Sequence, residues 1–294
     1  MSRRISTALV QHAMAPDVDE NRRRSLEGVE AAAERGARLL VLPELHASEY
    51  FCKFQDPELH DLAEPLDGPT AQGLSSAAKQ HQLVIVGSIF ERRAAGLSHN
   101  TAVVFDQDGS LAGIYRKMHI PDDPGYNEKF YFAPGDLGFE PIQTSLGRLG
   151  VLVCWDQWYP EAARLMALAG AEVLIYPTAI GFDLNDDSDE QSRQLDAWRT
   201  IQRGHAVANG LPVLACNRVG MEPDRSGAGR DAKFWGHSFV AGPQGEMLAQ
   251  AGDETQLLMA DIDFERGEQV RRIWPFLRDR RIDDYSGLLK RWRD

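Results

Sequence analysis

The sequence predicts an α/β protein in which two mixed β-sheets pack face to face and helices cover both outer faces, a four-layer α-β-β-α sandwich. Short apolar segments, typical of buried strands, alternate along the chain with amphipathic segments typical of helices. The order β-α-β-α-β-β-β occurs twice. We find no residue-level repeat between the halves, so the pattern predicts a pseudo-two-fold duplication of architecture only.

The first half supplies five predicted strands and two predicted helices. The strands cover residues 5–12, 38–42, 83–90, 100–106 and 111–116. A helix over 18–35 ends at Gly36, as expected for a glycine that follows a helix. A second helix over 70–81 follows Gly68 and Pro69, because proline suits the first helical position.

The second half repeats this order after a loop over 118–138 that is rich in proline, glycine and aromatic residues. Its strands cover residues 149–154, 173–176, 212–217, 235–241 and 246–250. Its helices, over 160–169 and 190–209, each end at a glycine. Residues from about 265 to 294, rich in arginine and tryptophan, have no counterpart in the repeat. We expect one domain over 1–294, with this C-terminal segment packing on the domain or on a neighbouring subunit.

The composition and charge of the chain limit the classes of partner that it can bind. The chain has 294 residues, of which 43% are apolar and 26% charged, and its formal net charge is −12. No apolar run has the length of a membrane span, and no basic cluster occurs in the first 260 residues. This argues against nucleic acid or an anionic membrane as the partner and suits a small cationic substrate. The three cysteines form no CxxC pair and are too few for a disulfide framework, and this favours a cytoplasmic protein.

The stretch over 147–161, GRLGVLVCWDQWYPE, contains the first candidate for catalysis. An apolar strand leads into Cys154, and Pro160 follows where a helix can begin. This arrangement exposes a thiol at the carboxyl end of a strand, near a helix N-terminus that lowers the thiol pKa. The alternative is an inert core cysteine, since unpaired cysteine is among the most buried residue types.

Two further candidates end strands at the same predicted edge. Glu44 follows the strand over 38–42, and Lys117 follows the strand over 111–116. A carboxylate can take the proton of a thiol and return it to a leaving amine. An ammonium can stabilise a thiolate and then an oxyanion. Taken singly, Glu44 could be a helix or loop cap and Lys117 a solvated charge, but the three groups together form a coherent catalytic set.

These residues resemble the motifs of the nitrilase superfamily of carbon–nitrogen hydrolases. The chain reads Leu-Pro-Glu at 42–44, Tyr-Arg-Lys-Met-His at 115–119 and Val-Cys-Trp-Asp at 153–156, in the family's order. The resemblance covers about residues 5 to 265. Longer stretches, at 119–132 and 154–164, are similar to the members that hydrolyse N-carbamoylputrescine.

The resemblance implies a hydrolysis without cofactor or metal. Cys154 would attack the ureido carbon with Glu44 as the general base. Lys117 and the backbone N–H of Trp155 would stabilise the oxyanion, and Glu128 would position the substrate and support the lysine. Ammonia would leave, and water would resolve the carbamoyl thioester to putrescine and carbon dioxide. The resemblance also implies a homo-oligomer, a dimer or larger.

N-carbamoylputrescine has a primary ammonium separated from its ureido group by roughly 6 Å of extended chain. A site for it needs a carboxylate at the far end and apolar or aromatic walls between. Asp122, Asp183 and Asp187 follow strands at the predicted edge, and Tyr50, Trp155 and Phe182 could form the walls. An acidic substrate would need an arginine instead, and the candidates are Arg193, Arg199 and Arg218.

Three alternatives remain open. The first is another ureido or amide hydrolase of the superfamily, β-ureidopropionase-like or ω-amidase-like. The second is a non-catalytic binding member, which the intact set of Glu44, Lys117 and Cys154 disfavours. The third is a metal-dependent amidohydrolase, although the eight histidines form no HxH or HExxH pair.

Overall fold

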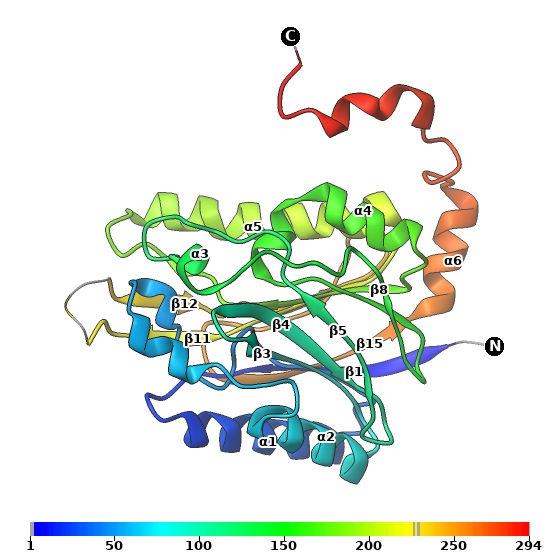
Figure 1. Ribbon diagram of the computed structural model, residues 1–294. Coiled ribbons are helices and arrows are strands. Elements are labelled where there is room, and N and C mark those ends of the chain that lie inside the picture. The colour runs from blue at the N-terminus through cyan, green and yellow to red at the C-terminus, as the bar shows by residue number, and fades with distance from the viewer. Residues whose placement is uncertain (1–2, 226, 228–229, 294) are drawn as a thin grey trace.

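The computed structural model describes residues 3–225, 227 and 230–293. Two six-stranded sheets lie between two helical layers, and the predicted α-β-β-α sandwich is confirmed (Figure 1). One outer layer contains α1 (Val18–Glu34) and α2 (Pro69–His81). The other contains α4 (Pro160–Leu168) and α5 (Ser188–Asn209).

The first sheet has the order β15-β1-β2-β3-β4-β5. Its strands are β1 (Arg4–Gln11), β2 (Leu39–Val41), β3 (Val84–Ala94), β4 (Leu97–Phe105), β5 (Leu111–Arg116) and β15 (Gln256–Asp263). Strands β1, β2 and β3 run parallel, and β4, β5 and β15 pair antiparallel to their neighbours.

The second sheet has the order β14-β13-β10-β8-β7-β6. Its strands are β6 (Ile142–Gln143), β7 (Arg148–Val151), β8 (Val173–Thr178), β10 (Val213–Asn217), β13 (Phe239–Ala241) and β14 (Met247–Gln250). Here β7, β8 and β10 run parallel, and the outer strands pair antiparallel. The two sheets therefore share one topology, as the duplicated pattern predicts, and the carboxyl ends of their parallel strands can supply a common site.

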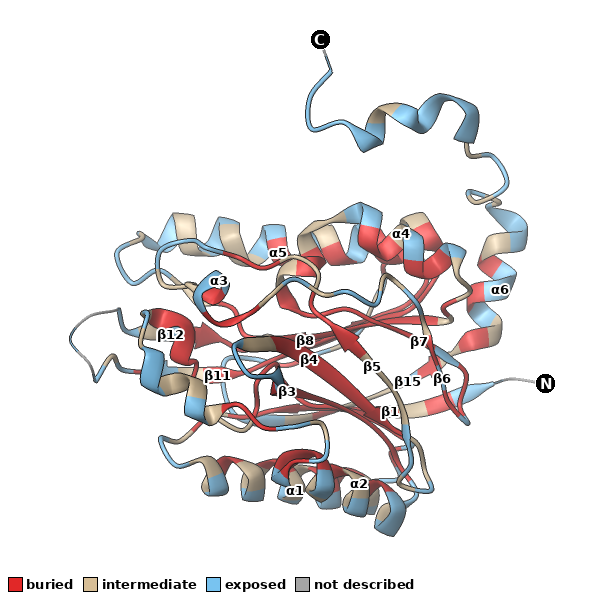
Figure 2. Ribbon diagram, in the orientation of Figure 1, coloured by how far each residue is buried: buried red, intermediate tan, exposed pale blue. Residues whose placement is uncertain are grey.

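Alternating side chains divide the core into two layers. In β2, Leu39 and Val41 pack between the two sheets, whereas Leu40 packs beneath α1 and α2. This period of two is expected for a strand buried on both faces. Figure 2 shows buried residues concentrated along the strands and on the inner faces of the helices.

The structure corrects the strand predicted over 235–241. Trp235 ends β12 (Ala232–Trp235), which pairs with β11 (Val219–Glu222) and β9 (Gly181–Phe182) in a separate three-stranded sheet. The next strand, β13, begins only at Phe239. Gly236 and His237, with φ of 64° and 55°, lie in the left-handed region and break the extended backbone between the two strands.

The predicted strand over 149–154 is also shorter than expected. β7 ends at Val151, and Cys154 begins a short 3₁₀ helix over Cys154–Trp158. Strand β15 and the helix α6 (Phe264–Ile273) were not predicted from the sequence. Phe264, Gly267 and Val270 of α6 are buried, so the C-terminal segment begins by packing on the domain.

Candidate active site

Three of the predicted residues meet at the carboxyl edge of the parallel strands. Glu44 follows β2, Lys117 follows β5, and Cys154 follows β7. The Lys117 ammonium donates to Glu44 Oε1 at 2.7 Å and to Glu128 Oε2 at 2.7 Å, and all three side chains are buried. A buried ion pair costs desolvation of both charges, so this cluster is better suited to function than to stability.

The two oxygens of Glu44 have different surroundings. Oε1 accepts from Lys117 and, at 2.7 Å, from the side-chain amide of Asn100. Oε2 is buried and has no hydrogen-bond partner among the described residues. A buried acceptor without a partner is costly, and this one leaves a carboxylate oxygen available to receive a proton.

Glu128 comes from the short helix α3 (Glu128–Tyr131), within the long loop that follows β5. Its Oε1 accepts from the Tyr50 hydroxyl at 2.7 Å. Burial raises the pKa of Glu128 to about 7, although the nearby Lys117 charge opposes the shift. For Lys117, burial opposes the charged form, but Glu128 and Glu44 outweigh it and hold its pKa well above the ordinary value. The lysine therefore carries a fixed positive charge.

Cys154 differs from the prediction in two respects. Its thiol is buried rather than exposed, with Sγ 3.7 Å from the carbonyl oxygen of Ala179. Burial raises its pKa well above the ordinary value, the charge of Glu44 raises it further, and Lys117 opposes the shift. Both burial and the charge of Glu44 favour the protonated thiol over the thiolate. The thiol needs a base to become a nucleophile.

Two non-glycine residues at the site have left-handed backbone conformations, Leu45 with φ of 48° and Cys154 with φ of 42°. Such conformations cost about 1–3 kcal/mol and persist where surrounding contacts enforce them. Beside Leu45, the buried Arg218 guanidinium donates to the carbonyl oxygens of Glu44 (2.6 Å) and Leu45 (3.0 Å) and to Glu222 (2.8 Å). Arg218 therefore shapes the Glu44 turn.

This position of Arg218 removes it as the ligand of an acidic substrate, because the guanidinium is fully buried and both terminal nitrogens donate to carbonyl oxygens or to Glu222. Its Nε has no partner among the described residues. Arg193 is exposed and pairs with Glu190 on α5. Arg199 is partly buried, which lowers its pKa, and its Nε has no partner among the described residues. The role of Arg218 was not predicted, because no local sequence pattern shows that a side chain directly after β10 contacts the Glu44 turn.

Aromatic rings extend from the buried centre toward the surface. Tyr50 and Tyr126 lie with ring centroids 5.5 Å apart, and the Tyr126 hydroxyl accepts from the backbone N–H of Gly181 at 3.2 Å. Both tyrosines line a cavity with Phe182, Asp183 and Arg230. Tyr126 was not among the predicted residues, although an aromatic residue two positions before Glu128 is a usable signal.

The other predicted binding residues lie as follows. Trp155 is partly buried and meets Trp158 edge to face, with centroids 6.5 Å apart. Asp183 is exposed and pairs with Arg230 at 3.0 Å. Asp187 caps α5 by accepting from the Glu190 N–H. Asp122 is exposed and is not among the residues that line the cavity next to Tyr50.

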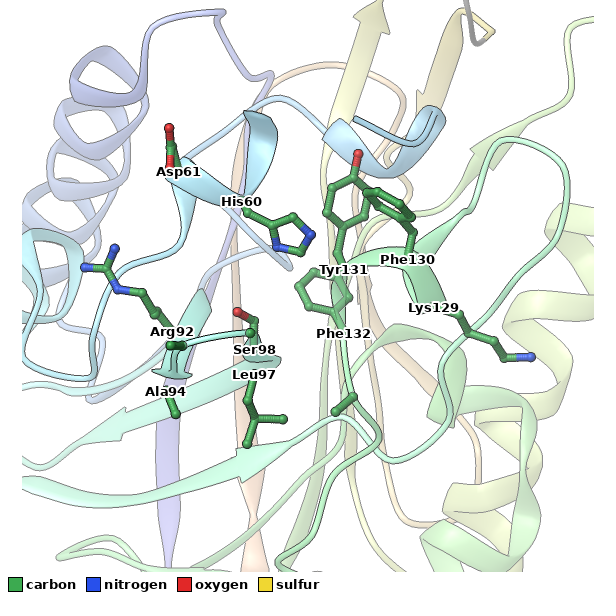
Figure 3. Close-up of a pocket in the computed structure, with 13 residues that line it drawn as sticks. His60, Asp61, Arg92, Ala94, Leu97, Ser98, Lys129, Phe130, Tyr131 and Phe132 are labelled. Atoms are coloured by element: carbon green, nitrogen blue, oxygen red, sulfur yellow. The ribbon is translucent and has the colours of Figure 1, made fainter. Parts of the chain in front are cut away.

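A second hollow lies on the outer side of α3, between Lys129–Phe132, His60 and the start of β4 (Figure 3). It contains none of the predicted site residues. Among the described residues, no group of three or more His, Cys, Asp or Glu side chains is placed to hold a metal ion. Within the residues that the structure describes, no helix has the length and apolar composition needed to cross a membrane.

The sequence matches the carbon-nitrogen hydrolase family model over residues 6–272. The chain belongs to this family. The predicted membership of the nitrilase superfamily is thereby confirmed.

Curated relatives of this carbon–nitrogen hydrolase match over nearly full length. It is 44% identical to N-carbamoylputrescine amidase of Solanum tuberosum, over 98% of this chain and 96% of that protein. It is 40% identical to citrullinase of Francisella tularensis, over 98% of this chain and 99% of that protein.

Solved structures agree with the fold. A carbon-nitrogen hydrolase from Helicobacter pylori has a TM-score of 0.96 and 55% identity, covering 99% of this chain and all of that chain. A variant of the amidase from Nesterenkonia sp. AN1 has a TM-score of 0.76 and 26% identity, covering 95% of this chain and 94% of that chain. That variant carries the acetamide moiety of fluoroacetamide covalently at its active-site cysteine.

Proposed function

We propose that this carbon–nitrogen hydrolase cleaves N-carbamoylputrescine through a covalent intermediate on Cys154. The observation that carries the mechanism is the unpartnered Oε2 of Glu44, buried in the same cluster as a thiol whose pKa is raised. Such a thiol is a poor nucleophile until a base removes its proton. Glu44 is the carboxylate whose charge acts most strongly on it.

In the first half-reaction, Glu44 takes the proton of Cys154, and the sulfur attacks the ureido carbonyl carbon. The oxyanion that forms is stabilised by the Lys117 ammonium and by the backbone N–H of Trp155. Glu44 then returns the proton to the terminal nitrogen, the carbon–nitrogen bond breaks, and ammonia leaves. The product on the enzyme is a carbamoyl thioester.

In the second half-reaction, Glu44 takes a proton from water, and the hydroxide adds to the thioester carbon. Collapse of this intermediate breaks the carbon–sulfur bond and returns the proton to Cys154. The released N-carboxyputrescine loses carbon dioxide to give putrescine. Glu128 holds Lys117 in place through its 2.7 Å ion pair.

The cavity supports a substrate that is cationic at its far end. The Ala179 carbonyl lies beside Cys154, and Asp183 follows four residues later, at most about 14 Å away along extended chain. The ammonium of N-carbamoylputrescine, roughly 6 Å beyond the ureido group, falls within this span. Phe182, Tyr50 and Tyr126 line the cavity, and we propose Asp183 rather than Asp122 as the carboxylate that meets the ammonium.

One observation favours a second substrate. Asp183 is paired with Arg230, and both line the cavity beside Tyr50 and Phe182. A carboxylate beside a guanidinium complements the ammonium and carboxylate of an α-amino acid. Citrulline carries a ureido group at one end and such a pair at the other, and a relative 40% identical is a citrullinase. We therefore propose citrulline as the second candidate.

The deciding experiment measures ammonia release from N-carbamoylputrescine, citrulline, N-carbamoyl-β-alanine and glutaramate in parallel. We expect the highest kcat/KM with N-carbamoylputrescine. A preference for N-carbamoyl-β-alanine or glutaramate would contradict both candidates. Full activity in excess chelator is expected, and loss of activity there would favour a metal-dependent hydrolase instead.

We further propose that the protein is a cytoplasmic homo-oligomer. Its three cysteines are free thiols, as a reducing compartment allows. Large apolar side chains are exposed along the C-terminal segment beyond α6, which extends away from the body of the domain (Figure 1). They are Trp274, Phe276, Ile282, Leu288, Leu289 and Trp292. Light scattering should give at least twice the monomer mass, and removal of residues 274–294 should lower it; a monomeric full chain would contradict the proposal.

A further inference from the structure

Asp156 is a fully buried carboxylate that the proposed mechanism does not use. It directly follows Trp155 in the 3₁₀ helix that begins at Cys154. Its two oxygens receive four hydrogen bonds. Oδ2 accepts from the Val153 N–H at 3.0 Å and from the Tyr115 hydroxyl at 2.8 Å. Oδ1 accepts from the His119 N–H at 3.0 Å and lies 2.7 Å from His119 Nδ1.

These contacts join two segments that are distant in sequence. Val153 immediately precedes Cys154, so its bond to Asp156 closes the turn that holds Cys154 at φ of 42°. Tyr115 and His119 lie two residues before and two residues after Lys117. A single carboxylate thus links the segment that carries the thiol to the segment that carries the ammonium.

Only a group with acceptors alone fits this position. A carboxylate offers about four lone-pair sites on two oxygens, matching the four donors. An asparagine would place its NH₂ group against the backbone N–H of either Val153 or His119, whichever way the amide is turned. The same requirement fixes the His119 tautomer with its proton on Nδ1, and the ring is further held by parallel stacking on Tyr159, with centroids 3.8 Å apart.

We propose that Asp156 is a positioning residue that fixes the separation and orientation of Cys154 relative to Lys117. It touches neither the substrate nor the reacting atoms. It affects the rate by keeping the Cys154 sulfur aligned with the carbonyl carbon of the substrate while Lys117 stabilises the oxyanion. This inference rests on the proposed roles of those two residues. Tyr115, which donates to Asp156, contributes to the same positioning.

The test compares two buried tyrosines of the core between the sheets. Tyr115→Phe removes one donor to Asp156, whereas Tyr176→Phe removes a hydroxyl that has no partner among the described residues. Asp156→Asn is the stronger variant. For each protein we would measure kcat and KM on N-carbamoylputrescine, the alkylation rate of Cys154 by iodoacetamide, and the unfolding midpoint, with kinetics recorded well below that midpoint.

We expect kcat of Asp156→Asn to fall about 100-fold with KM changed less than threefold, because a misplacement of about 1 Å costs this much. Tyr115→Phe should lose about fivefold and Tyr176→Phe should retain the parent kcat, with matching changes in alkylation rate. Equal kcat in Tyr115→Phe and Tyr176→Phe, or a fall in kcat explained by the folded fraction alone, would overturn the inference.

The alkylation rate of Cys154 tests the role of Asp156 independently of the proposed substrate. If the parent protein fails to hydrolyse N-carbamoylputrescine, the proposed substrate is wrong. The alkylation rates of Cys154 in Tyr115→Phe and Tyr176→Phe still test Asp156, since they need no substrate. Should Asp156→Asn fail to fold, this tyrosine pair decides the outcome: a slower reaction of Cys154 in Tyr115→Phe alone supports the inference, and equal rates overturn it.

Discussion

The two ends of the proposed substrate site are built differently. At the reacting end, Glu44, Lys117 and Glu128 are buried, and 2.7 Å contacts hold them together. At the outer end, Asp183 and Arg230 are exposed and form one ion pair at 3.0 Å. Exposed pairs of this kind contribute at most about 1 kcal/mol. Removal of one partner from a buried pair costs about 3–5 kcal/mol.

This difference implies a division of labour. The reacting end is pre-organised, so its groups need no rearrangement when charge develops on the substrate. The outer end is adaptable, because the exposed pair can exchange its contacts with water for contacts with the charged end of a substrate. Changes at the buried end should therefore abolish the chemistry, and changes at the outer end should alter substrate choice.

The largest effect is expected at Cys154. Cys154→Ala removes the nucleophile, and we expect kcat/KM to fall at least about 10⁴-fold. The fold should persist, because alanine fits the buried position. Cys216→Ala is the matched control: Cys216 is also a free, fully buried cysteine, but its Sγ lies 3.3 Å from the Val41 carbonyl. Ammonia release measures both, and activity that survives in Cys154→Ala would contradict the mechanism.

Glu44→Gln should be next. The amide oxygen can keep the contacts with Lys117 and Asn100, but Nε2 replaces the free oxygen and cannot accept a proton. We expect kcat to fall about 10³-fold with small changes in KM, as for loss of a general base. Glu64→Gln changes another buried carboxyl, which contacts Thr70 N at 2.9 Å, and should retain the parent kcat. A similar fall in both variants would exclude the specific role of Glu44.

The reacting end was also the part that the sequence predicted best. Glu44, Lys117 and Cys154 each follow a strand whose carboxyl end lies at the predicted edge, and the resemblance to the nitrilase superfamily joined them into one predicted site. The duplicated order of elements predicted both sheets. In contrast, β15 pairs with β1 between residues about 250 apart, as in Gln11 opposite Gln256, and no local pattern specifies such a pairing.

Other features depend on burial and distant contacts, which periodicity does not encode. A helix N-terminus predicted a lowered pKa for Cys154, but desolvation raises it. Asp156 and Arg218 have no motif that reveals their partners, because those partners come from other strands. Glycine at 236 and a left-handed histidine at 237 split a strand that reads as continuous.

Glu128 tests whether the buried end sacrifices stability for function. Burial raises its folded pKa from 4.5 to about 7, so between these pH values the folded protein holds a proton that the unfolded chain has released. The stability from this group is present below pH 4.5 and is lost as pH rises through about 7, by about 1.4 kcal/mol per pH unit.

Glu128→Gln should remove that slope from the free energy of unfolding, measured by denaturant titration between pH 4.5 and 7. It should also lower kcat about 10²-fold, because Lys117 loses one of its two anionic partners and shifts. Parallel stability curves for the two proteins would contradict the raised pKa of Glu128.

The smallest effects are expected at the outer end, and they should depend on the substrate. Arg230→Gln removes the guanidinium that would meet a carboxylate, so kcat/KM for citrulline should fall about fivefold. The same change releases Asp183 from its ion pair, and KM for N-carbamoylputrescine should fall slightly. Asp183→Asn should raise KM for both substrates about fivefold with kcat nearly unchanged. Arg225→Gln is the control, since Arg225 is exposed nearby but pairs with Glu49. If Arg230→Gln changed kcat/KM equally for both substrates, the Asp183–Arg230 pair would have no part in choosing between them. The proposed difference between the two ends of the site would then be wrong.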